Sequence, residues 1–174
     1  MREPLNQARV QRLLRELSAA APRKGHFRVF LTGGATAIER GWRSSTLDAD
    51  LSANDDAVFG NVQRLKEVLN LNIEFVKPTD FVPSLVGEEA RHVFIKTIGH
   101  VEFFHFDPYA QAFSKLVRGF ERDLEDVNHM VDAGWVNLGE LAALVAKIPP
   151  SAFQKYPSIS KKAALAAVER FRRS

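Results

Sequence analysis

Two aspartates in a short alternating segment form the strongest chemical signal in the sequence. In Thr46-Leu47-Asp48-Ala49-Asp50-Leu51, polar and apolar residues alternate with the periodicity of a β-strand. Asp48 and Asp50 then project from one face of that strand, about 7 Å apart along the backbone. Carboxylate oxygens are ligands that Mg²⁺ prefers, and substrate phosphates usually complete its shell. The pair therefore predicts a site for one or two Mg²⁺ ions and a phosphate-bearing substrate.

Thirteen residues separate a pair of glycines from Asp48 of this strand. Gly33 and Gly34 follow the β-rich segment 27–32 and come before a short helical segment. Glycines at such a turn let backbone N–H groups approach an anion closely. Each signal is common when it stands alone, but the combination at this spacing is specific and predicts a phosphate cradle beside the carboxylates.

A third group of charged residues lies near the start of the C-terminal third. Lys115, Arg118 and Arg122 are spaced by three and seven residues, so on one helix they share a stripe that could face a triphosphate. Asp123 and Asp126 share a stripe as well, and one of them could orient a basic side chain. The alternative is a surface helix carrying Arg–Asp pairs.

The elements that position these residues follow from hydrophobic periodicity and from Gly and Pro signals. The sequence predicts helices at 5–20, 35–40, 58–69, 111–133, 137–147 and 160–173, and strands at 27–32, 46–52, 72–77, 92–98 and 101–106. We expect an α+β fold with a small mixed sheet. The acids lie on one face of that sheet and helices cover the other. Residues 1–110 would form the core with its N-terminal helix, and 111–174 a C-terminal helical bundle packed on it.

Composition narrows the class of protein. The 174 residues include no cysteine, which excludes thiol catalysis, disulfides and iron–sulfur clusters. No apolar stretch approaches the roughly 20 residues of a membrane span, and the first residues are polar, so we expect no membrane association and a cytoplasmic location.

Charge is distributed unevenly behind the net value of +3. Residues 1–46 hold nine Lys and Arg against three acids, 47–110 hold five against eleven, and 111–174 hold ten against seven. An acidic segment between basic ends suits a metal site set among groups that bind a polyanion. A solvated surface with uneven charge is the alternative.

The segments around these residues resemble a known enzyme family. Gly33-Gly34-Ala35-Thr36-Ala37, Gly41-Trp42-Arg43 and 46–51 resemble the first motif of the AbiEii-type nucleotidyltransferases, a toxin-like branch of the DNA polymerase β superfamily. Ser114-Lys115-Leu116, Arg118, Arg122-Asp123-Leu124 and Asp126 resemble its second motif. Within this branch, the chain is most similar to a group of small uncharacterised bacterial domains.

The resemblance implies a nucleotidyltransferase fold and a third carboxylate on a neighbouring strand. Glu74, in Ile73-Glu74-Phe75, is the first candidate, followed by Asp107 and Glu102. The implied metal ligands are Asp48, Asp50 and Glu74, which with Lys115 are also the implied catalytic residues. The implied nucleotide-binding residues are Gly33, Gly34, Arg43, Thr46, Lys115, Arg118, Asp123 and Asp126.

The implied activity is Mg²⁺-dependent transfer of a nucleoside monophosphate from an NTP to a hydroxyl, with two Mg²⁺ ions. RNA is the acceptor that the resemblance suggests, and a toxin–antitoxin system with a cognate antitoxin protein is its implied setting. Two alternatives stay open: a catalytically silent binding module with the same fold, and an enzyme that uses the carboxylates to cleave phosphodiesters or transfer phosphoryl groups.

Two further residue classes yield weaker expectations. The five histidines show no metal-binding spacing, and we expect His100 and His105 at a polar sheet edge. The phenylalanines fall mainly in the predicted core, although one of them could stack a base; they are Phe103, Phe104, Phe106, Phe113 and Phe120.

Overall fold

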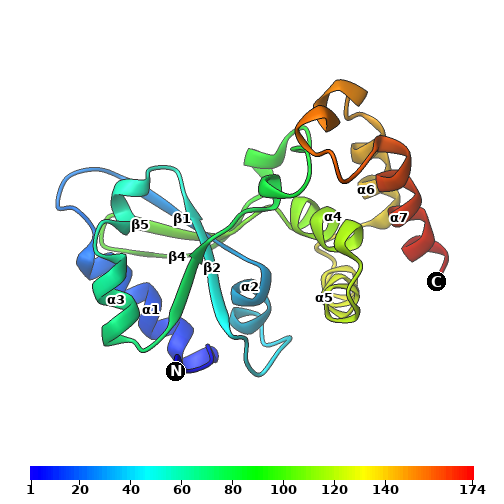
Figure 1. Cartoon of the computed structure of the whole chain (residues 1–174). Helices are drawn as coiled ribbons and strands as arrows, with labels where there is room; N and C mark the ends of the chain where they lie inside the picture. Colours follow the sequence, from blue (N-terminus) through cyan, green and yellow to red (C-terminus); the bar gives the residue numbers. More distant parts are fainter. The chain divides into compact units, whose positions relative to one another are not determined.

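The computed structural model describes residues 1–174 and divides into two compact units (Figure 1). The first unit, residues 1–77 and 93–106, contains the sheet, and the second, residues 78–92 and 107–174, is helical. Residues 78–92 group with the C-terminal helices because the short turns η2 (Pro78–Asp80) and η3 (Glu88–Arg91) contact α4 (Pro108–Arg118).

The first unit is built on a mixed sheet of five strands in the order β3-β2-β1-β5-β4. Strand β2 is antiparallel to β1 and parallel to β3, while β5 is parallel to β1 and antiparallel to β4. The strands are β1 (Phe27–Thr32), β2 (Asp48–Ala53), β3 (Asn72–Phe75), β4 (Val93–Ile98) and β5 (Val101–His105). The predicted α+β class with a small mixed sheet is confirmed.

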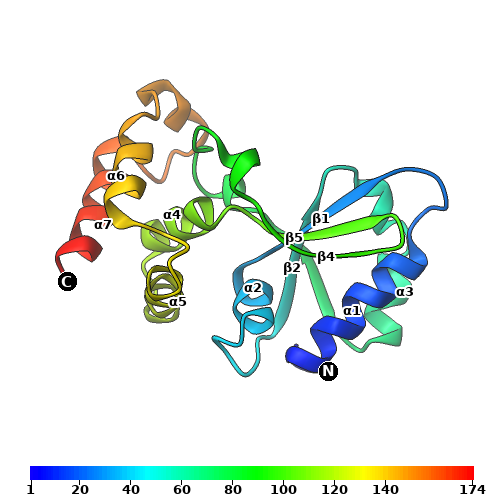
Figure 2. The same cartoon turned by 180° about the vertical axis from the view of Figure 1, so that it is seen from behind.

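Helices cover one face of this sheet. Figures 1 and 2 show α1 (Gln7–Ala20) and α3 (Val62–Val68) on the same side of the strands. Asn6 caps the start of helix α1, because its side chain accepts a hydrogen bond from the Arg9 N–H at 3.0 Å. Its leucines join a buried cluster with Ala49 and Leu51 of β2. Because strand side chains alternate, Asp48 and Asp50 project from the opposite face.

Two helix starts in the first unit differ from the prediction. Helix α2 (Gly33–Glu39) already includes both glycines, two residues before the predicted start. The segment predicted as a helix from residue 58 starts as the 3-10 turn η1 (Asp56–Phe59), whose cap Asp55 accepts a hydrogen bond from the Ala57 N–H at 2.9 Å. The turn ends at Gly60, before α3 begins.

The second unit consists of four α-helices and connecting turns. They are α4, α5 (Glu121–Asp132), α6 (Leu138–Ala146) and α7 (Lys161–Arg173), with η4 (Pro150–Lys155) between the last two. Helix α4 packs against α5 and α7, and α6 packs against α7. None of the chain's helices combines the length and the apolar character needed to cross a bilayer.

The prediction of one continuous helix over 111–133 is wrong. Helix α4 ends at Gly119, which has a φ of 74° and donates its N–H to the Lys115 carbonyl at 2.8 Å. Residues with a side chain rarely adopt this left-handed conformation, so glycine here ends the helix. Lys115 and Arg118 therefore lie on α4, whereas Arg122, Asp123 and Asp126 lie on α5.

His105 connects α2 to β5. Its ring is 2% exposed and lies between the Thr36 hydroxyl, 3.1 Å from Nδ1, and the Glu39 carboxylate, 2.7 Å from Nε2. The expectation of a polar edge position is wrong for this residue, because its strand neighbours alternate and His105 falls on the covered face. The hydrogen bond from His105 holds the pKa of Glu39 below its ordinary value of 4.5, against the opposing effect of burial.

We predict that Glu39→Gln lowers the melting temperature near pH 7 by about 2–4 °C, the shift expected for loss of roughly 1 kcal/mol in a chain of this size. A carboxyl with a depressed folded-state pKa stabilises the fold above its unfolded pKa, and this contribution is lost as pH falls through the folded value. The difference between wild type and variant should therefore shrink as pH falls below 4.5 and vanish once pH is below the lowered folded-state pKa of Glu39. Thermal melts over a pH series, with exposed Glu67→Gln as control, test this; parallel curves for wild type and Glu39→Gln would contradict it.

Candidate functional site

The glycine turn and the aspartate strand pack directly on each other. Gly33 has a φ of 57°, and a Cβ built on it would lie 2.8 Å from Asp50 Oδ2. A Cβ on Gly34 would lie 2.4 Å from Thr46 Oγ1, well inside van der Waals contact. Both positions therefore exclude larger residues, and the turn sets the position of the Asp50 carboxylate.

The register places the predicted acids on one face of adjacent strands. Asp50 pairs with Glu74 of β3 on one side and with Thr32 of β1 on the other, and Asp48 pairs with Asn72. Residues paired in register project from the same face. Asp48, Asp50 and Glu74 thus share the face that the helices leave uncovered.

Asn72 is a site residue that the sequence reasoning missed. Its amide nitrogen donates to Asp48 Oδ1 at 2.5 Å and to Glu74 Oε1 at 3.1 Å. An amide group has two N–H donors, one for each carboxylate, so Asn72 holds the two acids near each other. Its position two residues before Glu74 on a strand was a usable signal, because strand periodicity puts both on one face.

The three candidates for the third carboxylate have different surroundings. Glu74 is exposed on the strand next to β2. Glu102 lies on β5, which β1 separates from β2, and its carboxylate is 3.5 Å from the Arg28 guanidinium. Asp107 belongs to the helical unit, is fully buried and pairs with Arg91 at 2.7 Å. Glu74 alone adjoins the aspartate strand.

The donor set suits Mg²⁺ in type. The structure brings no group of three or more His, Asp or Glu side chains into an arrangement that could hold a metal ion. Mg²⁺ sites commonly use one or two carboxylates together with substrate phosphates and water. Asp48 and Asp50 meet this requirement in chemistry, and the Asp50 carboxylate lies against the Cβ-free backbone of Gly33.

Thr46 and Arg43 lie in the segment between α2 and β2. Thr46 and Leu5 form an isolated antiparallel β-bridge. The Leu5 N–H donates to the Thr46 carbonyl at 2.7 Å, and the Thr46 N–H donates to the Leu5 carbonyl at 3.0 Å. The Arg43 N–H donates to the Ala37 carbonyl at 3.4 Å, just after α2. These contacts fix the backbone that carries both residues, and their roles in nucleotide binding stay predictions.

The predicted second group forms a buried charge cluster in the helical unit. Lys115 is 4% exposed, and its Nζ lies 2.7 Å from Asp126 Oδ2 and 3.7 Å from Asp123 Oδ1. Arg118 donates two hydrogen bonds to Asp123, at 2.5 and 3.0 Å, while its side chain stays 46% exposed. The cluster joins α4 to α5 across the Gly119 break.

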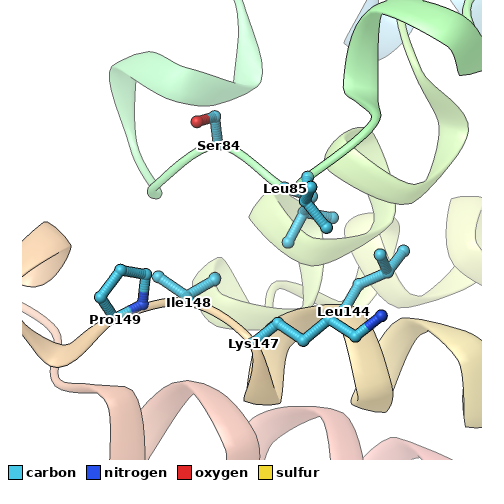
Figure 3. A pocket seen from close by; sticks show the side chains of 7 residues that line it. Ser84, Leu85, Leu144, Lys147, Ile148 and Pro149 are labelled. Atoms are coloured by element: carbon cyan, nitrogen blue, oxygen red, sulfur yellow. The ribbon is translucent and has the colours of Figure 1, made fainter.

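Hollows in the helical unit involve few of the predicted residues. Arg118 lines one of about 440 Å³, together with Phe81 and Tyr156. Another, of about 220 Å³, lies between the 84–86 segment and the end of α6, where Leu85, Leu144 and Ile148 converge (Figure 3). None of the predicted site residues lines this second hollow.

Comparison with known protein families places the chain among nucleotidyltransferases. Residues 8–164, well over half of the chain, match the protein family described as "Nucleotidyltransferase of unknown function (DUF6036)". The chain is also similar to the crystal structure of an antigenic nucleotidyltransferase-like protein from Paracoccidioides brasiliensis, with 14% identity, 95% coverage of both chains and a TM-score of 0.42. A search of curated proteins finds no match.

We predict that Gly34→Ala destabilises the first unit by about 1–3 kcal/mol, since the added methyl group overlaps the Thr46 side chain. Adding Thr46→Ala removes two of the three clashing atoms and should recover part of the loss. Gly60→Ala is the matched control, because its Cβ would meet nothing closer than 3.4 Å. Urea unfolding gives the free energies; equal stabilities of Gly34→Ala and Gly60→Ala would refute the packing argument.

We also predict that Asp126→Ala destabilises the helical unit by about 3–5 kcal/mol, because it removes the closest partner of the buried Lys115 ammonium. The double variant Lys115→Met with Asp126→Leu should be much closer to wild type, since it leaves no buried unpaired charge at these positions. Exposed Glu125→Ala on the same helix should change stability by less than about 0.5 kcal/mol. A loss below 1 kcal/mol for Asp126→Ala in urea unfolding would contradict this reading of the cluster.

Proposed function

This chain belongs to the DUF6036 family of nucleotidyltransferases, and from that membership we propose that it transfers a nucleoside monophosphate from an NTP to a hydroxyl. The observation that carries the proposal is the contact between the glycine turn and the Asp50 carboxylate. This contact places the backbone of two glycines, which carry no side chains, beside the two aspartates on one face of the sheet. This is the combination that a triphosphate with bound Mg²⁺ requires.

In this proposal Asp48 and Asp50 hold the metal and Glu74 completes the site. When bound, Mg²⁺ neutralises charge on the phosphates and favours ionisation of the attacking hydroxyl. Asn72 keeps Asp48 and Glu74 oriented through its two amide N–H groups. Glu74, exposed beside Asp50 in register, accepts the proton of the acceptor hydroxyl.

In the first unit, Gly33, Gly34, Arg43 and Thr46 bind the triphosphate in this proposal. Within the helical unit, Arg118, half exposed, is better suited than the buried Lys115 to contact a phosphate. Lys115, Asp123 and Asp126 then serve to fix the Arg118 side chain and the start of α5 rather than to touch the nucleotide.

The finer assignments rest on the AbiEii-type resemblance. We propose RNA as the acceptor, two Mg²⁺ ions, and a toxin-like enzyme with a cognate antitoxin in the cytoplasm. The charge pattern supports a polyanionic acceptor, because the basic segments 1–46 and 111–174 flank the acidic middle of the sequence.

We predict that Asp48→Asn and Asp50→Asn each reduce nucleotide transfer by about 10²–10³-fold, since each removes charge stabilisation at the reacting phosphates. Exposed Asp56→Asn, close by in the sequence but in the turn after β2, should retain full activity. The assay supplies Mg²⁺, each labelled NTP in turn and total bacterial RNA, and follows pyrophosphate release and label incorporation.

The outcomes of this assay separate the candidate functions. Equal activity of wild type and both Asn variants would refute the proposal. NTP binding by calorimetry without incorporation into RNA, protein or a small molecule would favour a silent binding module. Phosphodiester cleavage without incorporation would favour the hydrolytic alternative.

A further inference from the structure

A row of phenylalanines crosses the same sheet face as the acids. Phe30 of β1 pairs in register with Phe104 of β5, which pairs with Phe94 of β4. Register partners share a face, and Phe30 also pairs with Ser52, two residues along β2 from Asp50. We call Phe30, Phe104 and Phe94 the aromatic row. It lies on the face opposite α1 and α3, and the strand order places it beside the carboxylates.

The rings are in contact and partly accessible. Ring centroids are 5.7 Å apart for Phe30 and Phe104, and 5.6 Å apart for Phe104 and Phe94. Phe94 is 56% exposed, an unusual state for a phenylalanine within a strand. The Arg28 guanidinium lies 5.8 Å from the Phe104 ring centre, with its side chain 59% exposed. The row thus combines π surfaces with a cation above one of them.

The composition of the face distinguishes this row from a protein-docking patch. Apart from the phenylalanines, the residues that the register places on it are all polar or charged: Arg28, Thr32, Asp48, Asp50, Ser52, Asn72, Glu74, Thr97 and Glu102. None of these paired residues is aliphatic. Adjoining aromatic rings among polar groups on a sheet face suit the stacking of nucleic-acid bases, which tolerates any sequence.

We propose that the aromatic row binds bases of a single-stranded RNA. In the proposed transfer reaction this RNA is the acceptor, and to that extent the inference rests on the proposed function. The bases stack on Phe94 and Phe104, and Arg28 contributes a cation–π contact and reaches a phosphate. Along β1, Arg28, Phe30 and Thr32 project in turn from this face, and Thr32 is the register partner of Asp50. A strand bound to the row therefore leads toward the carboxylates.

The charges on the row predict a weak dependence on salt. Glu102 lies 3.5 Å from Arg28 and offsets its charge, so stacking dominates over phosphate attraction. Contact with one phosphate corresponds to a slope of about −0.7 in log K against log salt for a single strand. A steep slope would instead indicate binding through the basic segments at the chain ends.

The test measures binding of fluorescein-labelled eight-residue oligoadenylate and oligouridylate to the full chain by anisotropy, in EDTA and without NTP. Phe94→Leu and Phe104→Leu should each weaken binding at least fivefold, since each removes a stacking surface and keeps apolar bulk. Phe75→Leu is the matched control: Phe75 is 50% exposed on β3, and its register partner Leu51 belongs to the covered face. It should bind as wild type does, and circular dichroism checks that all variants are folded.

The inference is overturned if wild type binds neither oligonucleotide, or if folded Phe94→Leu and Phe104→Leu bind as well as wild type does. Equal weakening in Phe75→Leu would also overturn it.

Self-association in sedimentation velocity that Phe94→Leu abolishes, without oligonucleotide binding, would assign the row to protein contact instead. Row-dependent binding without nucleotide transfer would support this inference and refute the proposed function. If both row variants transfer nucleotides to RNA as well as wild type does, the proposed function is supported and this inference is refuted.

Discussion

The close packing of a glycine turn on the aspartate strand is the constraint on which the first unit depends. Gly34 leaves room for the Thr46 side chain, and Gly33 leaves room for the Asp50 carboxylate. A side chain at Gly33 would collide with the Asp50 carboxylate, and one at Gly34 would collide with the Thr46 side chain. The spacing of the glycines and aspartates in the sequence is therefore a structural requirement as well as a chemical one. The same packing orients the carboxylate that the proposed chemistry needs.

Periodicity predicted the strands well because their hydrophobic alternation records which face is covered. Ala49 and Leu51 are buried with α1, and Asp48 and Asp50 are not, as the pattern of 46–52 indicated. The helix break at Gly119 was missed because the apolar spacing continues across it, and the positive φ of one glycine decides the geometry. His105 was misplaced because a polar residue on the covered face depends on partners from α2, which local sequence does not reveal.

The proposed site was predictable only in part, because local sequence does not show which contacts form between separate elements. Asp48, Asp50 and Glu74 follow strand periodicity, and the register places them side by side. Asn72 was missed because an amide carries no motif, and its role appears only when β3 is paired with β2. The spacing of Lys115, Arg118 and Arg122 suggested a basic stripe on one helix, and Asp123 and Asp126 a stripe of their own. The turn at Gly119 instead brings α5 back against α4, so buried Lys115 pairs with Asp123 and Asp126, and half-exposed Arg118 pairs with Asp123.

Competition for carboxylate lone pairs explains why Glu74 is the strongest candidate for the third acid. Asp107 accepts two hydrogen bonds from Arg91 and one from the Tyr109 N–H, which caps α4. If Asp107 bound a metal, the Arg91 guanidinium and the N-terminus of α4 would both lose their hydrogen-bond acceptor. Glu102 is held by the cation that also lies over Phe104. Glu74 receives a single amide hydrogen bond at 3.1 Å, is exposed, and adjoins Asp50. Of the three candidates, Glu74 could therefore bind a metal or accept a proton with the loss of the fewest hydrogen bonds.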